Sequence, residues 1–132
     1  MTNASDWEQR FVKRYIDKRR RERYLTFLSN EKRRRKILNR LCHSLDYDET
    51  RATLLEKHDQ TFDRVLELVR EQGVSSVCYL MAYSSDLDGS DFELETAVTE
   101  LLFSSLGAVL ICPPKPIALY KPEDIGILIL LK

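Results

Sequence analysis

The chain has 132 residues, of which 43% are apolar and 32% charged, and its 21 basic and 21 acidic residues give a formal net charge of zero. A chain of this length is typical of one domain with a substantial core, and the composition excludes a simple polycation and a globally disordered protein. Four Gly and four Pro are too few for a collagen-like chain, and no apolar run reaches the roughly 20 residues that span a bilayer.

The first third of the chain is predicted to be helical. Trp7, Phe11 and Tyr15 recur at helical spacing and predict a helix over residues 5–28. Seven consecutive charged residues, 17–23, interrupt its apolar pattern. Because they occupy almost two turns and surround the helix, we expect no face of this segment to enter an apolar core.

A second helix is predicted over residues 31–44. Ser29 and Asn30 are typical of a helix break and an N-cap in front of it. The helix opens with a run that is charged on every side, and its apolar stripe follows only afterwards, at Ile37, Leu38, Leu41, Cys42 and Leu45.

The middle of the chain mixes helices with the first strand. Residues 46–58 are compatible with a loop or a short helix, and Asp59 is expected to cap a helix that ends at Gln72. Within residues 74–83, apolar residues occupy both odd and even positions, which predicts a central strand buried on both faces. Ser90 and Glu93 match a capping box at the start of a helix over 91–106.

Three short strands are predicted to complete the chain, over 108–112, 117–120 and 127–131. The last is apolar throughout, so we expect it to be central, covered by helices, or part of a subunit interface, which leaves a homodimer open. The order α-α-α-β-α-β-β-β predicts an α+β fold, with α/β as the alternative, and a mixed sheet of about four strands. We expect a basic helical region, 1–45, and an α/β region, 46–132, in one continuous unit.

The net charge of zero hides a strong segregation. Residues 10–40 hold 14 Lys or Arg and three acids, a net of +11, whereas residues 41–132 have a net charge of −9. Two basic blocks within this range, residues 18–23 and 32–36, suit contacts with phosphate groups, since Arg makes forked hydrogen bonds to phosphate oxygens. We therefore predict a nucleic-acid or other polyanion site made of Lys18, Arg19, Arg20, Arg21, Arg23, Lys32, Arg33, Arg34, Arg35 and Lys36. The alternative is a solvated helical surface that pairs loosely with the acidic remainder of the chain.

An acidic segment after the predicted central strand is the second candidate site. Asp86, Asp88, Gly89 and Glu95 fall partly in the register of an EF-hand loop, although a strand precedes them and Ser84 replaces the first acid. Weak candidates for cation ligands are Asp86, Asp88 and Asp91. The alternative is an acidic turn whose side chains cap the following helix.

Signals for catalysis are thin. The four glycines form neither a dinucleotide-binding nor a P-loop pattern, and the spacing of Cys42, His43, His58 and Cys78 matches no metal site. We therefore expect a small binding protein without cofactors and lean away from an enzyme. A protein-interaction module that uses the acidic 84–100 surface, such as an adaptor, inhibitor or immunity-type protein, is the first alternative. The second is a metal-dependent enzyme that acts on nucleic acid.

The three cysteines, Cys42, Cys78 and Cys112, are widely spaced and odd in number. This pattern indicates buried free thiols in a reducing compartment rather than a disulfide framework. The N-terminal residues do not resemble a secretory signal. A cytoplasmic location is therefore expected, with the nucleus as an alternative and without membrane association.

Overall fold

A computed structural model describes residues 6–43, 46–73, 77–84, 86–104, 106–113, 117–123 and 126–132. Within these ranges the α-helices are α1 (Asp6–Tyr15), α2 (Arg21–Leu28), α3 (Glu31–His43), α4 (Phe62–Glu71) and α5 (Leu94–Phe103). Short 3-10 helices are η1 (Lys18–Arg20), η2 (Glu49–Arg51) and η3 (Lys57–Asp59). The strands are β1 (Ala52–Leu54), β2 (Val77–Ala82), β3 (Ser90–Glu93), β4 (Ala108–Cys112), β5 (Ile117–Lys121) and β6 (Ile129–Leu131).

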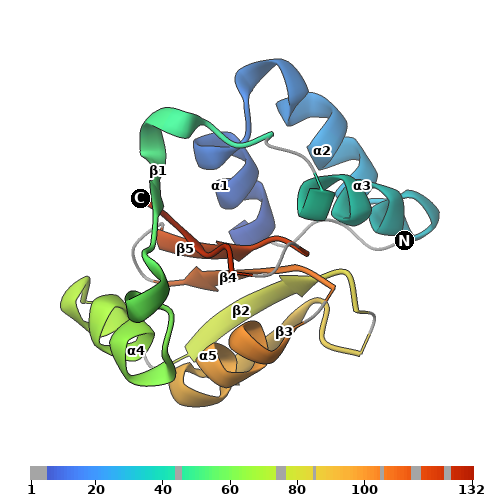
Figure 1. The fold of residues 1–132 in the computed structure, drawn as a ribbon. Coiled ribbons are helices and arrows are strands. Elements are labelled where there is room, and N and C mark those ends of the chain that lie inside the picture. The colour runs from blue at the N-terminus through green and yellow to red at the C-terminus, as the bar shows by residue number, and fades with distance from the viewer. Residues whose placement is uncertain are drawn as a thin grey trace.

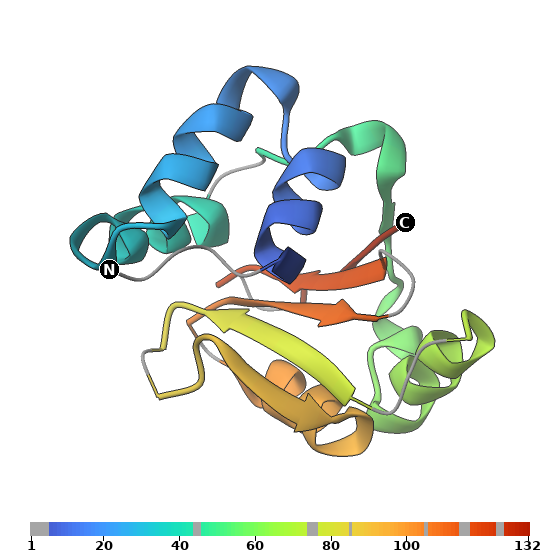
Figure 2. The same cartoon turned by 180° about the vertical axis from the view of Figure 1, so that it is seen from behind.

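The strands of the described residues form one antiparallel sheet in the order β1-β6-β5-β4-β2-β3. Helices α1, α2 and α3 cover one face of this sheet, and α4 and α5 cover the other (Figures 1 and 2). Side chains alternate along each strand, so Tyr79 and Met81 pack towards α1–α3 while Cys78 and Leu80 pack towards α4 and α5. Both faces of the sheet are therefore buried beneath helices.

The α+β class is confirmed, but the sheet differs from the expected mixed sheet of about four strands. The two additional strands are its short edges, β1 and β3, and every described pairing is antiparallel. β3 consists of Ser90–Glu93, the segment read as a capping box, and its backbone pairs with β2 over Val77–Leu80. Pairing satisfies the backbone groups on the outer side of β2, and the helix α5 begins only at Leu94.

The strand predicted within residues 74–83 is central, and the last strand is central too, which is one of the three places expected for it. β2 lies between β3 and β4, and β6 lies between β1 and β5 with all three of its residues buried. Because both sides of β6 are paired, the last strand is not an open edge, and a homodimer stays a prediction. The cysteines Cys42, Cys78 and Cys112 are buried free thiols, as expected.

The first predicted helix is divided in two. α1 ends at Tyr15, and the next residues leave the helical path because Ile16 bridges to Tyr47 and the Asp17 amide donates to the Asp46 carbonyl at 2.7 Å. The Asp17 side chain caps η1 by accepting from the Arg19 amide at 3.2 Å. The charged run thus starts a new segment rather than extending α1.

The other helix ends test the cap assignments. Asn30 accepts hydrogen bonds from the amides of Lys32 and Arg33, at 3.0 and 3.2 Å, so its predicted role as an N-cap of α3 is confirmed. Thr61, not Asp59, caps α4, and Phe62 at its start is exposed. None of the described helices is long and apolar enough to cross a membrane.

Candidate functional site

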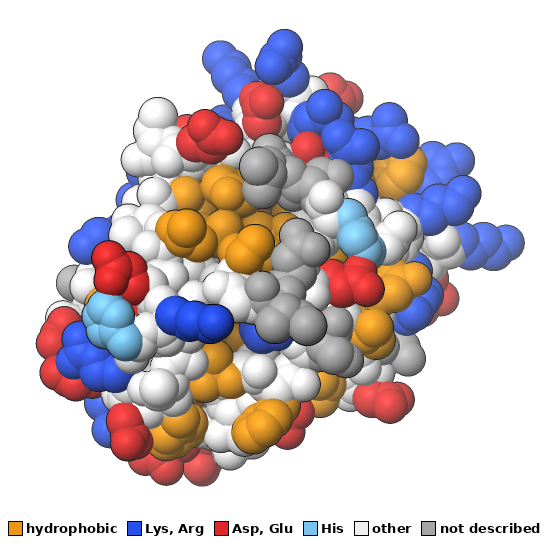
Figure 3. Space-filling model, viewed as in Figure 1, with side chains coloured by type: hydrophobic (Ala, Val, Ile, Leu, Met, Phe, Trp, Pro, Cys, Tyr) orange, Lys and Arg blue, Asp and Glu red, His pale blue; other side chains and the backbone are white. Residues whose placement is uncertain are grey.

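The ten predicted basic residues lie on η1, α2 and α3, and most of them face solvent. Figure 3 shows Lys and Arg side chains gathered over the part of the molecule where α2 and α3 lie. Eight of the ten residues are exposed, and Arg21 and Arg34 are half-buried. The Arg21 side chain donates from Nε to the Ile16 carbonyl at 2.9 Å, so it secures the turn between α1 and η1.

The two basic blocks meet at one aromatic ring. The Cζ atom of Arg23, from the first block, lies 5.0 Å from the centroid of the Phe27 ring, and that of Arg33, from the second, lies 5.4 Å from it. The tight connection between α2 and α3 produces this arrangement, because Asn30 caps α3 only two residues after α2 ends. A further cation–π contact places Arg35 4.7 Å from the Tyr83 ring centroid.

Seven of the predicted residues form a surface with little internal compensation, which we call the α2–α3 basic surface. Among the described residues, no carboxylate lies within ion-pair distance of six of them, and Arg19 is 3.7 Å from Asp17 with its own side chain 91% exposed. A pair that exposed contributes little stability. The members of the surface are Lys18, Arg19, Arg23, Lys32, Arg33, Arg35 and Lys36.

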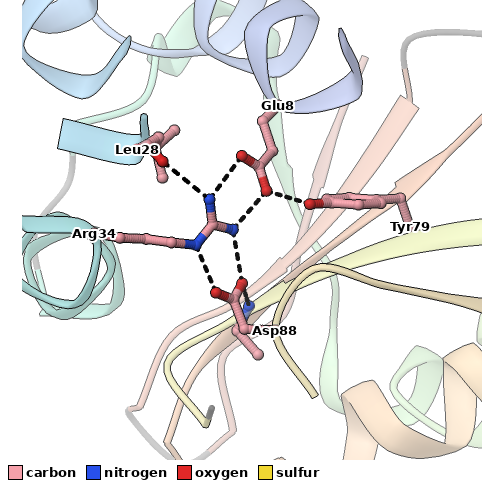
Figure 4. A network of polar contacts seen from close by, with 6 residues as sticks. Glu8, Leu28, Arg34, Tyr79 and Asp88 are labelled. Carbon is pink, nitrogen blue, oxygen red and sulfur yellow. Dashed lines mark hydrogen bonds and ion pairs between the residues drawn. The ribbon is translucent and has the colours of Figure 1, made fainter. Parts of the chain in front are cut away.

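Arg34 is different, because it lies between two carboxylates inside the molecule (Figure 4). Its guanidinium binds Glu8 at 2.8 and 2.5 Å and Asp88 at 2.6 and 2.9 Å. It also donates to the Leu28 carbonyl at 3.2 Å, while the Tyr79 hydroxyl donates to Glu8. The side chains of Glu8, Arg34 and Asp88 are only 1%, 14% and 15% exposed, so these charges compensate each other away from water.

Burial by itself would lower the pKa of Arg34, but its hydrogen bonds to the Glu8 and Asp88 carboxylates outweigh that effect and raise it. The guanidinium therefore stays charged and joins α1, α3 and the turn after β2. It is not available to an external anion, which corrects the expectation that all ten basic residues form one binding site.

A second internal network surrounds Asp46, whose side chain is 5% exposed. Asp46 accepts hydrogen bonds from the Tyr24 hydroxyl at 2.6 Å and from Arg40 Nε at 2.7 Å, and Arg20 Nε lies 3.2 Å away. Burial, followed by the hydrogen bond to Asp46, raises the pKa of Tyr24. Arg20 is thus partly engaged by the fold, although its side chain remains 44% exposed.

Sequence reasoning missed these networks because it read the charged runs as uniform. Ile37, Leu38 and Leu41 form the buried stripe of α3, and Arg34 lies one turn earlier on the same stripe. Glu8 stands in the same relation to the buried residues Phe11 and Val12 of α1. Opposite charges on the inward stripes of two helices were the available signal for an internal ion pair.

The three candidate cation ligands, Asp86, Asp88 and Asp91, differ in their surroundings. Asp88 accepts from Arg34 and from the Ala82 amide, whereas Asp86 is exposed and Asp91 is exposed within β3. In the described part of the chain, no group of three His, Cys, Asp or Glu side chains is placed to hold a metal ion. Glu95 forms an exposed ion pair with Arg70 at 3.0 Å. A protein partner for the 84–100 surface stays a prediction.

Cys78 of β2 and Cys112 of β4 are buried neighbours, and the hydrogen bond between their thiols lowers the pKa of Cys78. Cys42 is buried, and burial together with the charge of Glu123 raises the pKa of its thiol to about 12. His43 contacts Glu123, while His58 lies exposed on η3 beside Glu56 and Asp59. A thiol with so high a pKa is not a nucleophile near neutral pH.

Comparison with protein-family models, with curated proteins and with solved structures found no match for this chain. The functional argument therefore depends on the geometry of its own residues.

Proposed function

We propose that this protein binds nucleic acid through the α2–α3 basic surface. The observation that carries the proposal is the junction at Phe27, where Arg23 and Arg33 of different blocks lie within 5.4 Å of one ring centroid. Two basic blocks that are separate in the sequence thereby form one exposed surface. A surface of this kind suits a ligand whose negative charges repeat along its length.

The charge of the surface supports an external partner. Six of its seven cations lie beyond ion-pair distance of every described carboxylate, whereas Arg34 and Arg20 have carboxylate partners in the fold. Arginine binds phosphate oxygens in a forked geometry, and binding several phosphates releases the counterions condensed on the nucleic acid. The half-buried ring of Phe27, with an arginine to either side in sequence, offers an aromatic contact for an unstacked base.

The expected affinity is salt-dependent and weakly sequence-specific. With about five to seven phosphate contacts, the slope of log K against log salt should be about −4 to −6 on duplex, at roughly −0.9 per contact. Fluorescence anisotropy with labelled duplex and single-stranded DNA and RNA, at low and moderate salt, measures this slope. Single strands should bind at least as well as duplex if Phe27 stacks on bases.

A pair of charge-matched double variants tests the location of the site. Arg23→Gln with Arg33→Gln should reduce the magnitude of the salt slope by about two units, one per lost phosphate contact. Arg64→Gln with Arg70→Gln removes the same charge from α4 on the opposite face of the sheet and should leave the slope nearly unchanged. Failure of the folded wild-type protein to bind any of the four probes at low salt would refute the proposal, as would equal effects of the two double variants.

A further inference from the structure

A second group of cations surrounds a pocket of about 440 Å³ between α1, η2 and β4. Four basic side chains line it: Arg10, Lys13, Arg14 and Arg51. None of them belongs to the α2–α3 basic surface. In Figure 2, α1 is the dark blue helix that lies against the sheet, and residues of α1 and β4 share one core on this face.

The charge in this pocket is weakly compensated. Across the described ranges, no carboxylate lies within ion-pair distance of Arg10, Lys13 or Arg14, and Arg51 is 3.9 Å from Asp48. Glu8, in the first turn of α1, is engaged by Arg34. A pocket lined by four cations with one distant carboxylate favours a ligand that carries more than one negative charge.

Two buried polar atoms of residues lining this pocket are poorly satisfied. Among the described residues, Arg14 Nε and the Tyr15 hydroxyl are the buried side-chain polar atoms without a hydrogen bond of normal geometry, and the whole Tyr15 residue is only 1% exposed. Burial raises the pKa of Tyr15, and the nearby Arg14 guanidinium offsets part of that rise, so the two side chains are close to each other but poorly satisfied. An unsatisfied buried donor is unfavourable unless something else binds it. Both groups can donate, so they suit an acceptor such as a phosphate oxygen. Both atoms are covered, and the Arg14 guanidinium carbon lies 5.7 Å from the Tyr15 ring centroid.

The remaining lining residues are apolar or aromatic. Phe11 and Ile111 are 2% and 3% exposed and form buried parts of the lining, while Trp7 is half-buried with Arg10 4.9 Å from its ring centroid. Such a wall suits a flat organic ring rather than a bare inorganic anion. A cavity of about 440 Å³ lies within the roughly 300–1,000 Å³ range of small-molecule sites.

We propose that this pocket binds a nucleoside phosphate. Its phosphates contact Arg10, Lys13, Arg14 and Arg51 and accept hydrogen bonds from Arg14 and Tyr15. Its base lies against Trp7. The site is independent of the proposed nucleic-acid surface, with which it shares no residue.

Isothermal titration calorimetry with adenosine diphosphate as the probe tests this site, with adenosine and inorganic pyrophosphate as separate arms. We expect one molecule bound per chain, and weaker binding of each of the two fragments. No binding at millimolar concentration would overturn the proposal. Adenosine that binds as tightly as the diphosphate would overturn the anionic part, and pyrophosphate that does so would overturn the nucleoside part.

Two variants locate the ligand and separate binding from folding. Tyr15→Phe removes only the hydroxyl and should weaken binding of the diphosphate about tenfold or more, the effect of losing one hydrogen bond to a charged group. Its melting temperature without ligand should change little, because the hydroxyl makes no hydrogen bond of normal geometry within the described chain and only a polar contact with Arg14. Arg14→Gln should weaken binding at least as much, whereas Arg70→Gln, which removes the same charge on α4, should not.

The proposal fails if the diphosphate binds Tyr15→Phe and Arg14→Gln as tightly as the wild type. It also fails if Tyr15→Phe lowers the melting temperature by several degrees without lowering the affinity for the diphosphate, since the hydroxyl would then stabilise the fold instead of binding the ligand. The double variant Arg23→Gln with Arg33→Gln should bind the diphosphate like the wild type. This result would distinguish failure of the nucleic-acid proposal from failure of this one.

Discussion

Replacing Arg34 by Met should destabilise the protein far more than the same change at its neighbour Arg33. Met preserves much of the side-chain volume but leaves Glu8 and Asp88, which are 1% and 15% exposed, without their cation. Removing one partner of a buried ion pair typically costs about 3–5 kcal/mol of unfolding free energy. Arg33 is exposed, so Arg33→Met should change the unfolding free energy by less than about 0.5 kcal/mol.

Urea unfolding followed by circular dichroism measures both differences. At roughly 4 °C per kcal/mol for a chain of this length, Arg34→Met should also lower the melting temperature by about 12–20 °C. The difference between Arg34→Met and wild type should persist in 0.5 M salt, because ions screen exposed charges much more than buried ones.

Neutralising the whole network provides the control. The triple variant Glu8→Gln, Arg34→Met, Asp88→Asn leaves no buried charge and should recover a large part of the lost stability. If Arg34→Met loses less than about 1 kcal/mol, or no more than Arg33→Met, the inference of a buried compensated network is refuted. Nucleic-acid binding provides the opposite test, because Arg33→Met should lower the affinity for nucleic acid and leave the fold intact.

Two other changes follow from the structure. In the same urea assay, Gly107→Ala should lower the free energy of unfolding by about 3 kcal/mol or more, because at φ +96° its Cβ would lie 2.5 Å from the Cys42 Sγ. Gly126→Ala, at φ +84° with nothing within 4 Å of its Cβ, should lower it by about 1 kcal/mol. Equal losses would refute the steric argument. The free energy of unfolding should also fall above about pH 10, because the raised pKa of Tyr24 makes the folded state retain a proton that the unfolded state releases. Below that pH the contribution of Tyr24 to stability is fully present. Tyr24→Phe should show a smaller loss between about pH 9 and pH 11, and an unchanged loss would exclude this tyrosine as a source.

The regular elements were predictable where one local pattern decides them. Apolar residues at both odd and even positions identified β2 as a central strand, and the uniformly apolar last strand was consistent with the central place of β6. The edge strands β1 and β3 have no such pattern, since each contains three or four residues with exposed or half-buried side chains. They form because a neighbouring strand offers unpaired backbone groups, which is a property of the assembled sheet and not of the segment itself.

The candidate site was predictable in its location but not in its membership. The contiguous runs of basic residues were visible in the sequence, and eight of the ten residues named from them are exposed. The pocket beside α1 was missed because its cations are not contiguous. Arg10, Lys13 and Arg14 are spaced by three and four residues on α1, and Arg51 approaches from a distant segment.

The buried arginine also explains how the exposed ones are presented. Successive residues of an α-helix are rotated by about 100°, so fixing Arg34 against Glu8 and Asp88 turns Arg33 and Arg35 away from the core on either side. Arg33 then reaches Phe27 of α2, and Arg35 reaches Tyr83 at the end of β2. In a run of five basic residues, one sets the rotation of the helix and the other four face solvent, so the charge of the run overstates the number of contacts it can make with a ligand.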